Sequence, residues 1–99
     1  MSKVLIGLYE FEGPYSTDVE PIHEPGVLAI VRHCGDDLEI VRLNAADDVN
    51  RLWKQLRPFY AQWQPHELSM AVYYMPGLSK SERNRVLADI FDEFEMAAA

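Results

Sequence analysis

The segment from Ser79 onward is the part of the chain whose sequence most restricts its structure. Ser79 and Glu82 stand three residues apart, the spacing of a capping box, in which the serine hydroxyl accepts the N–H of residue 82 and the glutamate reaches back. Five apolar residues then recur at helical spacing: Val86, Leu87, Ile90, Phe91 and Phe94. A helix with one apolar face must bury that face against a second layer, which the rest of the chain has to supply.

The expected second layer is a β-sheet. Four segments are rich in apolar, β-branched or aromatic residues and predict strands: 4–11, 27–32, 38–43 and 68–74. Gly13-Pro14 is expected to end the first of them, and the three prolines between residues 13 and 26 predict an extended connection. The short turn around Gly35 joins the second and third strands into a hairpin.

A second helix is expected between the third and fourth strands. Its apolar face is formed by residues at helical spacing: Val49, Leu52, Trp53, Leu56 and Tyr60. Asn44 or Asp47 is the expected cap, and Asp47-Asp48 suits the positive end of the helix dipole. Pro58 is expected to end or kink this helix, with a short second helix through Trp63 as the alternative.

These elements predict an α+β domain with a small three- to four-stranded, mainly antiparallel sheet packed by two main helices. Its 99 residues are the length of a single domain, with a core over residues 24–94 and a strand over 3–11 added. Apolar residues make up 48% of the chain, which excludes a disordered protein.

The charge of the chain restricts its partners. Sixteen acidic against nine basic residues give a net charge of −7, and such a field opposes the approach of nucleic acid. No apolar run is long enough to cross a membrane, so no membrane partner is expected. The lone Cys34 allows no internal disulfide, and a free thiol without an export signal predicts a cytoplasmic protein.

Several short segments, in order over residues 24–94, resemble the GIY-YIG nuclease family. Glu24–Ile30 resembles the family's Pro-Gly-(Val/Ile)-Tyr strand, and Glu39–Leu43 lies where the family has its Tyr-Ile-Gly strand. Asp47–Leu52 resembles the helix that contains an Arg-Leu pair. Ala71–Tyr74 then matches the third strand, and Ser81–Arg83 matches the Glu-Arg opening of the last helix. The resemblance implies a small α+β fold and, in active members, metal-dependent cleavage of DNA.

The positions that carry this chemistry are mostly apolar here. The resemblance places Leu28 at the tyrosine that helps activate water, Leu87 near the glutamate that holds the metal, and Arg42 or Leu43 at the glycine of the second strand. Leucine cannot bind Mg²⁺. The arginine that stabilises the phosphorane is retained as Arg51, whose other interpretation is a solvated helix residue paired with Asp47.

Three functions remain open from the sequence. The first is a non-catalytic module that binds a protein or a second copy of itself through exposed aromatic residues of one segment: Trp53, Phe59, Tyr60 and Trp63. The second is a residual Mg²⁺-dependent phosphodiesterase that uses Arg51. The third is an acidic mimic of DNA. The non-catalytic binding module needs no cofactor and no metal. In that function, the acidic residues around Asp89 and Asp92 form a solvated face.

Overall fold

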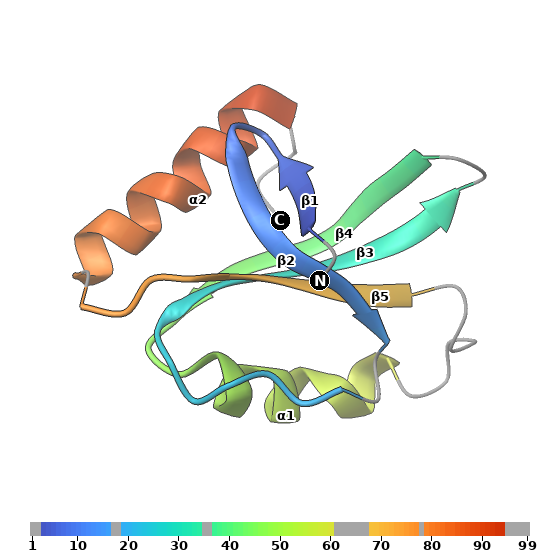
Figure 1. Cartoon of the computed structure of the whole chain (residues 1–99), viewed down its shortest axis with the longest axis horizontal. Coiled ribbons are helices and arrows are strands. Elements are labelled where there is room, and N and C mark those ends of the chain that lie inside the picture. The colour runs from blue at the N-terminus through green and yellow to red at the C-terminus, as the bar shows by residue number, and fades with distance from the viewer. Residues whose placement is uncertain (1–2, 17–18, 35–36, 61–67, 78, 95–99) are drawn as a thin grey trace.

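The computed structural model describes residues 3–16, 19–34, 37–60, 68–77 and 79–94, except the side chains of Cys34, Asp37, Leu38, Phe91, Glu93 and Phe94. Along the chain the elements are β1 (Lys3–Ile6), β2 (Tyr9–Ser16), β3 (Gly26–Cys34), β4 (Asp37–Ala46), α1 (Val49–Tyr60), β5 (Leu68–Tyr74) and α2 (Lys80–Phe94). The five strands form one antiparallel sheet in the order β1-β2-β5-β3-β4. Helix α1 covers one face of this sheet and α2 the other (Figure 1). The predicted α+β fold, with an antiparallel sheet packed by two main helices, is confirmed.

The sheet has one strand more than the three or four expected, because the segment 4–11 is a hairpin and not a single strand. Ile6 pairs with Tyr9, so Gly7 and Leu8 form a two-residue turn between β1 and β2. Gly7 has a φ of 65°, a left-handed conformation that glycine adopts without the steric cost of a Cβ. β2 also continues through Gly13-Pro14, where the sequence predicted its end, with a register irregularity between Glu12 and Tyr15.

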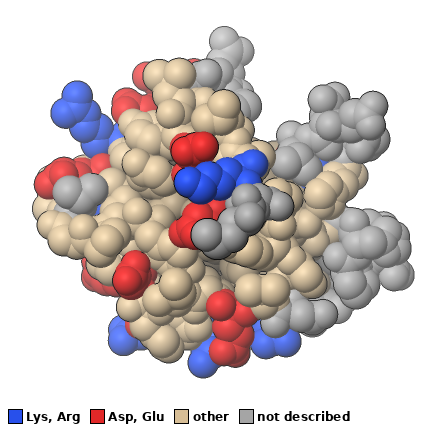
Figure 2. All heavy atoms as spheres, viewed as in Figure 1, with Lys and Arg blue, Asp and Glu red and all other residues tan. Residues whose placement is uncertain are grey.

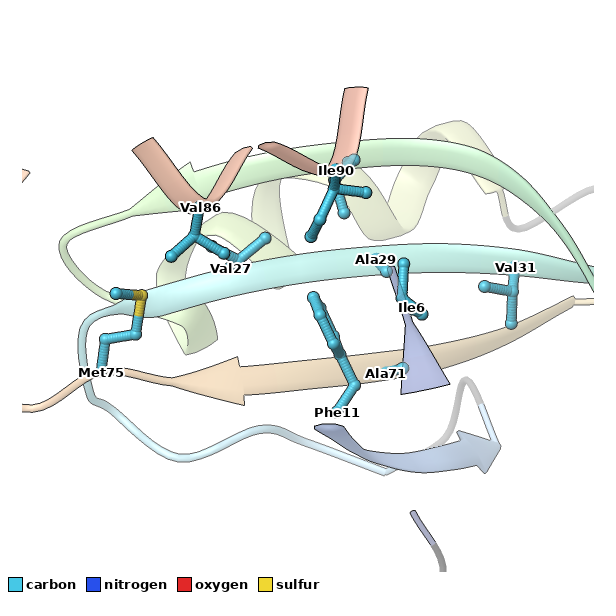
Figure 3. Close-up of a cluster of buried hydrophobic side chains, with 10 residues drawn as sticks. Ile6, Phe11, Val27, Ala29, Val31, Ala71, Met75, Val86 and Ile90 are labelled. Atoms are coloured by element: carbon cyan, nitrogen blue, oxygen red, sulfur yellow. The ribbon is translucent and has the colours of Figure 1, made fainter. Parts of the chain in front are cut away.

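Strand β3 lies inside the sheet, between β5 and β4, and alternates between two hydrophobic clusters. Leu28 and Ile30 pack on the α1 side, together with Val49, Trp53, Leu56, Leu68, Met70 and Val72. Val27, Ala29 and Val31 pack on the α2 side, together with Ile6, Phe11, Leu43, Ala71, Met75, Val86 and Ile90. Figure 3 shows Val86 and Ile90 reaching from α2 toward this second cluster. A strand buried on both faces is therefore almost entirely apolar, as its sequence predicts.

The two helices begin differently from each other. The predicted capping residue of α2 is confirmed, since the Glu82 N–H donates to Ser79 Oγ at 3.3 Å and the Ser79 hydroxyl donates to Glu82 Oε1 at 3.2 Å. In α1 the cap is Asp48, which accepts the Arg51 N–H at 3.0 Å, and not Asn44 or Asp47. Asn44 lies within β4 instead.

Pro58 does not end α1, because α1 continues to Tyr60. The alternative of a short second helix through Trp63 extends beyond the described residues. Pro58 is exposed and lies in the last turn, where the packing of Trp53 and Leu56 into the α1-side cluster holds the helix. In the described part of the chain, no helix has the length and apolar character needed to cross a membrane.

Candidate functional site

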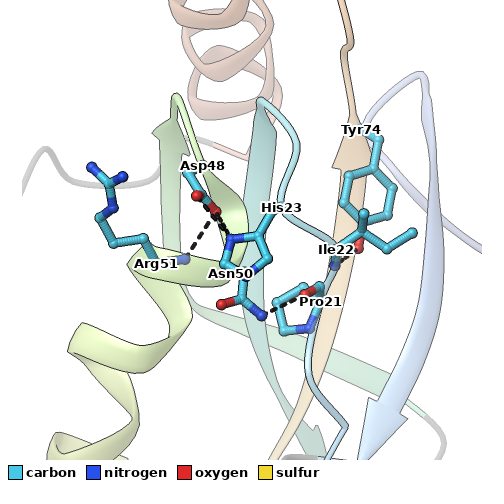
Figure 4. Close-up of polar contacts among 7 residues, drawn as sticks. All are labelled: Pro21, Ile22, His23, Asp48, Asn50, Arg51 and Tyr74. Carbon is cyan, nitrogen blue, oxygen red and sulfur yellow. Dashed lines mark hydrogen bonds and ion pairs between the residues drawn. The ribbon is translucent and has the colours of Figure 1, made fainter.

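The N-terminus of α1 carries the arginine that the resemblance assigns to catalysis. The segment before β3 runs beside it, and the Val49 N–H donates to the Glu24 carbonyl at 2.9 Å. Asp48 both caps the helix and contacts His23, whose Nδ1 lies 2.9 and 3.2 Å from the two carboxylate oxygens (Figure 4). The hydrogen bond with His23, followed by the Arg51 N–H, lowers the pKa of the Asp48 carboxyl below its ordinary value.

The other contacts at this end of α1 fasten the same segment to the fold. Asn50 is buried and donates through Nδ2 to the Pro21 carbonyl at 2.7 Å. The Ile22 N–H donates to the Tyr74 hydroxyl at 2.8 Å, and burial of that hydroxyl is the main cause that raises the pKa of Tyr74. Arg51 extends outward, away from His23 (Figure 4). These polar contacts therefore anchor the connection between β2 and β3 to α1 and β5.

The acid dependence of stability offers a test of the Asp48 contacts. Because the folded-state pKa of Asp48 is depressed, its stabilisation is complete above the unfolded pKa of about 3.9 and is lost as the pH falls through the folded pKa. Asp48→Asn keeps a good cap but removes the titrating group. Urea unfolding between about pH 5 and pH 3 should therefore show a smaller loss of stability in the variant than in the wild type. The matched control is Glu20→Gln, which removes another exposed carboxylate; equal acid dependence in the Asp48 variant and the wild type would contradict this role.

The positions that the resemblance assigns to one active site do not come together. Leu28 is buried in the cluster under α1, whereas Leu87 packs against the cluster under α2. The whole thickness of the sheet separates these two side chains. In β4, Leu43 is buried on the α2 side, and Arg42 is exposed and donates from Nε to Asn44 at 2.7 Å.

The ionic partner expected for Arg51 is engaged elsewhere. Asp47 forms an ion pair with Arg83, a buried residue in the first turns of α2. This pair ties the start of α2 to the connection between β4 and α1. Arg51 remains exposed at the surface.

The four aromatic residues expected at an interaction surface have different environments. Trp53 is 1% exposed and forms part of the α1-side cluster, so its side chain is not available to a partner in this fold. Tyr60 is half-buried against the same cluster. Phe59, by contrast, is 71% exposed. Trp63 lies outside the described residues.

A surface pocket of about 540 Å³ lies between the β1–β2 turn and α2. Its lining in the described part of the chain consists of Gly7, Leu8, Tyr9, Asp89, Ile90 and Asp92. The Tyr9 hydroxyl donates to Asp89 Oδ2 at 2.8 Å, and this bond is the first cause that raises the pKa of Tyr9. The tyrosine therefore stays protonated at neutral pH and holds the carboxylate beside the pocket. Leu8, at the tip of the turn, is 86% exposed.

This pocket is not apparent from the sequence, which predicts a solvated face around Asp89 and Asp92 and a single strand through Tyr9. The signal available in the sequence was Gly7, a glycine within an apolar run, which is typical of a turn or bulge. Recognising that turn would have placed Leu8 at an exposed tip.

A scan against protein-family models, a search of curated proteins and a search of solved structures found no match. Among the residues that the structure describes, no group of three or more His, Cys, Asp or Glu side chains could hold a metal ion.

Proposed function

We propose that this chain is a GIY-YIG-like domain without catalytic activity that binds a protein partner. The observation that carries the non-catalytic part of the proposal is the position of Leu28 and Leu87 on opposite faces of the sheet, each in a hydrophobic environment. A phosphodiesterase needs its base, its arginine and its metal ligands around one reacting group. The order of the elements β3, β4, α1, β5 and α2 along the chain is the one that the resemblance expects.

The surface of the domain favours a protein over a nucleic acid. The net charge is −7, and on the face seen in Figure 2 basic side chains lie scattered among acidic ones without forming a continuous basic area in the described part of the chain. Large apolar side chains are exposed at the β1–β2 hairpin, where Leu5 and Leu8 lie, and on α1 at Phe59. Leu8 borders the pocket between the β1–β2 turn and α2, so we place the partner there.

The catalytic part of the proposal is tested with purified protein, branched and linear DNA, and Mg²⁺ or Mn²⁺. We expect no cleavage above the buffer control, and no difference between the wild type and Arg51→Ala. Cleavage by the wild type that disappears in Arg51→Ala would overturn the proposal and establish the residual phosphodiesterase instead. An unfolding curve for Arg51→Ala provides the control, since the exposed Arg51 side chain should change stability by less than about 0.5 kcal/mol.

The binding part is tested by selecting peptides from a displayed random library against the wild-type domain. We expect enriched peptides that lose binding to Leu8→Asp, which places a charge at the exposed tip of the turn, and keep binding to Phe59→Asp on α1. Enrichment that does not depend on Leu8 would contradict the placement of the partner. The cytoplasmic setting proposed for this interaction rests on the lone Cys34 in the sequence.

A further inference from the structure

The pocket at the β1–β2 turn combines three kinds of surface. Asp89 and Asp92, one helical turn apart on α2, supply carboxylates. Leu8 and Ile90 supply apolar lining, and Tyr9 supplies an aromatic ring and a hydroxyl. The volume of about 540 Å³ lies in the range of ligand sites in proteins, which is roughly 300–1,000 Å³.

We infer that this pocket receives a lysine or arginine side chain from a basic segment of the partner. This inference rests on the proposed function and specifies the chemistry of the partner. The aliphatic stem of such a side chain packs on apolar surface while its charged head reaches acidic groups, which matches Leu8 beside the two aspartates.

The lining and the whole chain favour a cation for the same electrostatic reason. Both charged residues among the described lining are acidic, and the chain as a whole carries −7. Arg85 also acts on Tyr9, but its lowering of the Tyr9 pKa is a smaller effect than the raising by Asp89. A basic segment is therefore attracted at long range and paired at short range. The Tyr9 hydroxyl already orients Asp89, which reduces the side-chain entropy lost when the cation arrives.

The partner chemistry is tested with an acetylated and amidated pentapeptide, Gly-Leu-Lys-Leu-Gly, titrated into the ¹⁵N-labelled full chain by NMR. We expect the amide resonances of Gly7, Leu8, Tyr9 and Ile90 to shift. The same peptide with norleucine in place of lysine keeps the aliphatic stem and loses the charge. It should bind about two- to fivefold more weakly, the range of a solvent-exposed ion pair. Raising NaCl from about 50 to 500 mM should weaken only the lysine peptide.

Two matched variants connect the effect to the pocket. Asp92→Asn should weaken the lysine peptide about two- to fivefold and leave the norleucine peptide unchanged. Glu20→Gln removes the same charge from an exposed residue outside the described lining and should leave both peptides unchanged. Both substitutions are at exposed positions, so folding is not expected to suffer.

The outcomes separate this inference from the proposed function. Equal binding of the two peptides at the pocket would overturn the lysine or arginine assignment, while Leu8-dependent peptides from the library would still support a protein-binding domain. No shift at the pocket with either peptide would also overturn the assignment, and the absence of Leu8-dependent peptides would remove the proposed function as well. Dimers in sedimentation that Asp92→Asn abolishes would identify a second copy of this chain as the occupant and overturn the basic segment.

Discussion

Replacing Trp53 by alanine is expected to lower the free energy of unfolding by about 3–5 kcal/mol. Trp53 is among the largest fully buried side chains and belongs to the α1-side cluster, together with Leu28 and Ile30 of β3. Its indole Nε1 has no hydrogen-bond partner among the described residues, so the loss comes from packing and from the cavity left behind. Since small domains are stable by only about 5–15 kcal/mol, urea unfolding should show a large shift of the midpoint.

Phe59, on the same helix, is the matched control for Trp53. Phe59→Ala removes an aromatic side chain that is 71% exposed and should change stability by less than about 0.5 kcal/mol. The sequence predicts that both residues belong to an interaction surface. Comparing the two variants shows which of them instead stabilises the fold by packing. Equal effects of the two substitutions would show that Trp53 does not pack in the α1-side cluster.

Gly26→Ala is expected to destabilise the domain by about 3 kcal/mol, near the upper end of the usual range for overpacking. A Cβ at this position would overlap the Tyr73 carbonyl oxygen and would lie 3.1 Å from Tyr74 Cα. Both contacts are with the backbone of β5, which pairs directly with Gly26. The Met75 N–H also donates to the Pro25 carbonyl at 2.8 Å, so relief of the clash must separate two bonded strands.

Gly77→Ala is the comparison for Gly26. Gly77 has a φ of 78° and no described atom within 4 Å of an added Cβ, so alanine there should cost about 1 kcal/mol through backbone strain alone. Thermal and urea unfolding of the two variants should therefore rank Gly26→Ala as the less stable. The reverse order would mean that β3 and β5 can separate easily. Gly26 belongs to the Pro-Gly pair that resembles the family motif. The close approach of β5 explains why this position requires glycine, so no catalytic role is needed to explain it.

The sequence predicts the elements of this fold better than their boundaries. Strand β3 was recognisable because nearly every residue in it is apolar, and α2 because Ser79 and Glu82 mark its start. The β1–β2 hairpin was missed because its turn contains a single glycine, Gly7, within apolar residues on both sides. The cap of α1 was misplaced among neighbouring polar residues, since only the backbone geometry shows which carboxylate reaches the Arg51 N–H.

The candidate site was less accessible from the sequence for a different reason. Helical spacing identifies an apolar face but does not say which face of the sheet that helix covers. The assignment of Leu28 and Leu87 to one centre depended on that missing information, and the structure places them on opposite sides. Likewise, Asp89 and Tyr9 are eighty residues apart, and no local pattern predicts their hydrogen bond.

The central sheet gives this chain two hydrophobic interiors that share no side chain, one under α1 and one under α2. Substitutions more than about 7–10 Å apart with no common partners usually act independently. The α1-side cluster, which contains Trp53, lies on the opposite face of the sheet from the pocket. Substitutions at exposed lining positions such as Leu8 and Asp92 are therefore expected to change the surface of the pocket without changing the packing under α1.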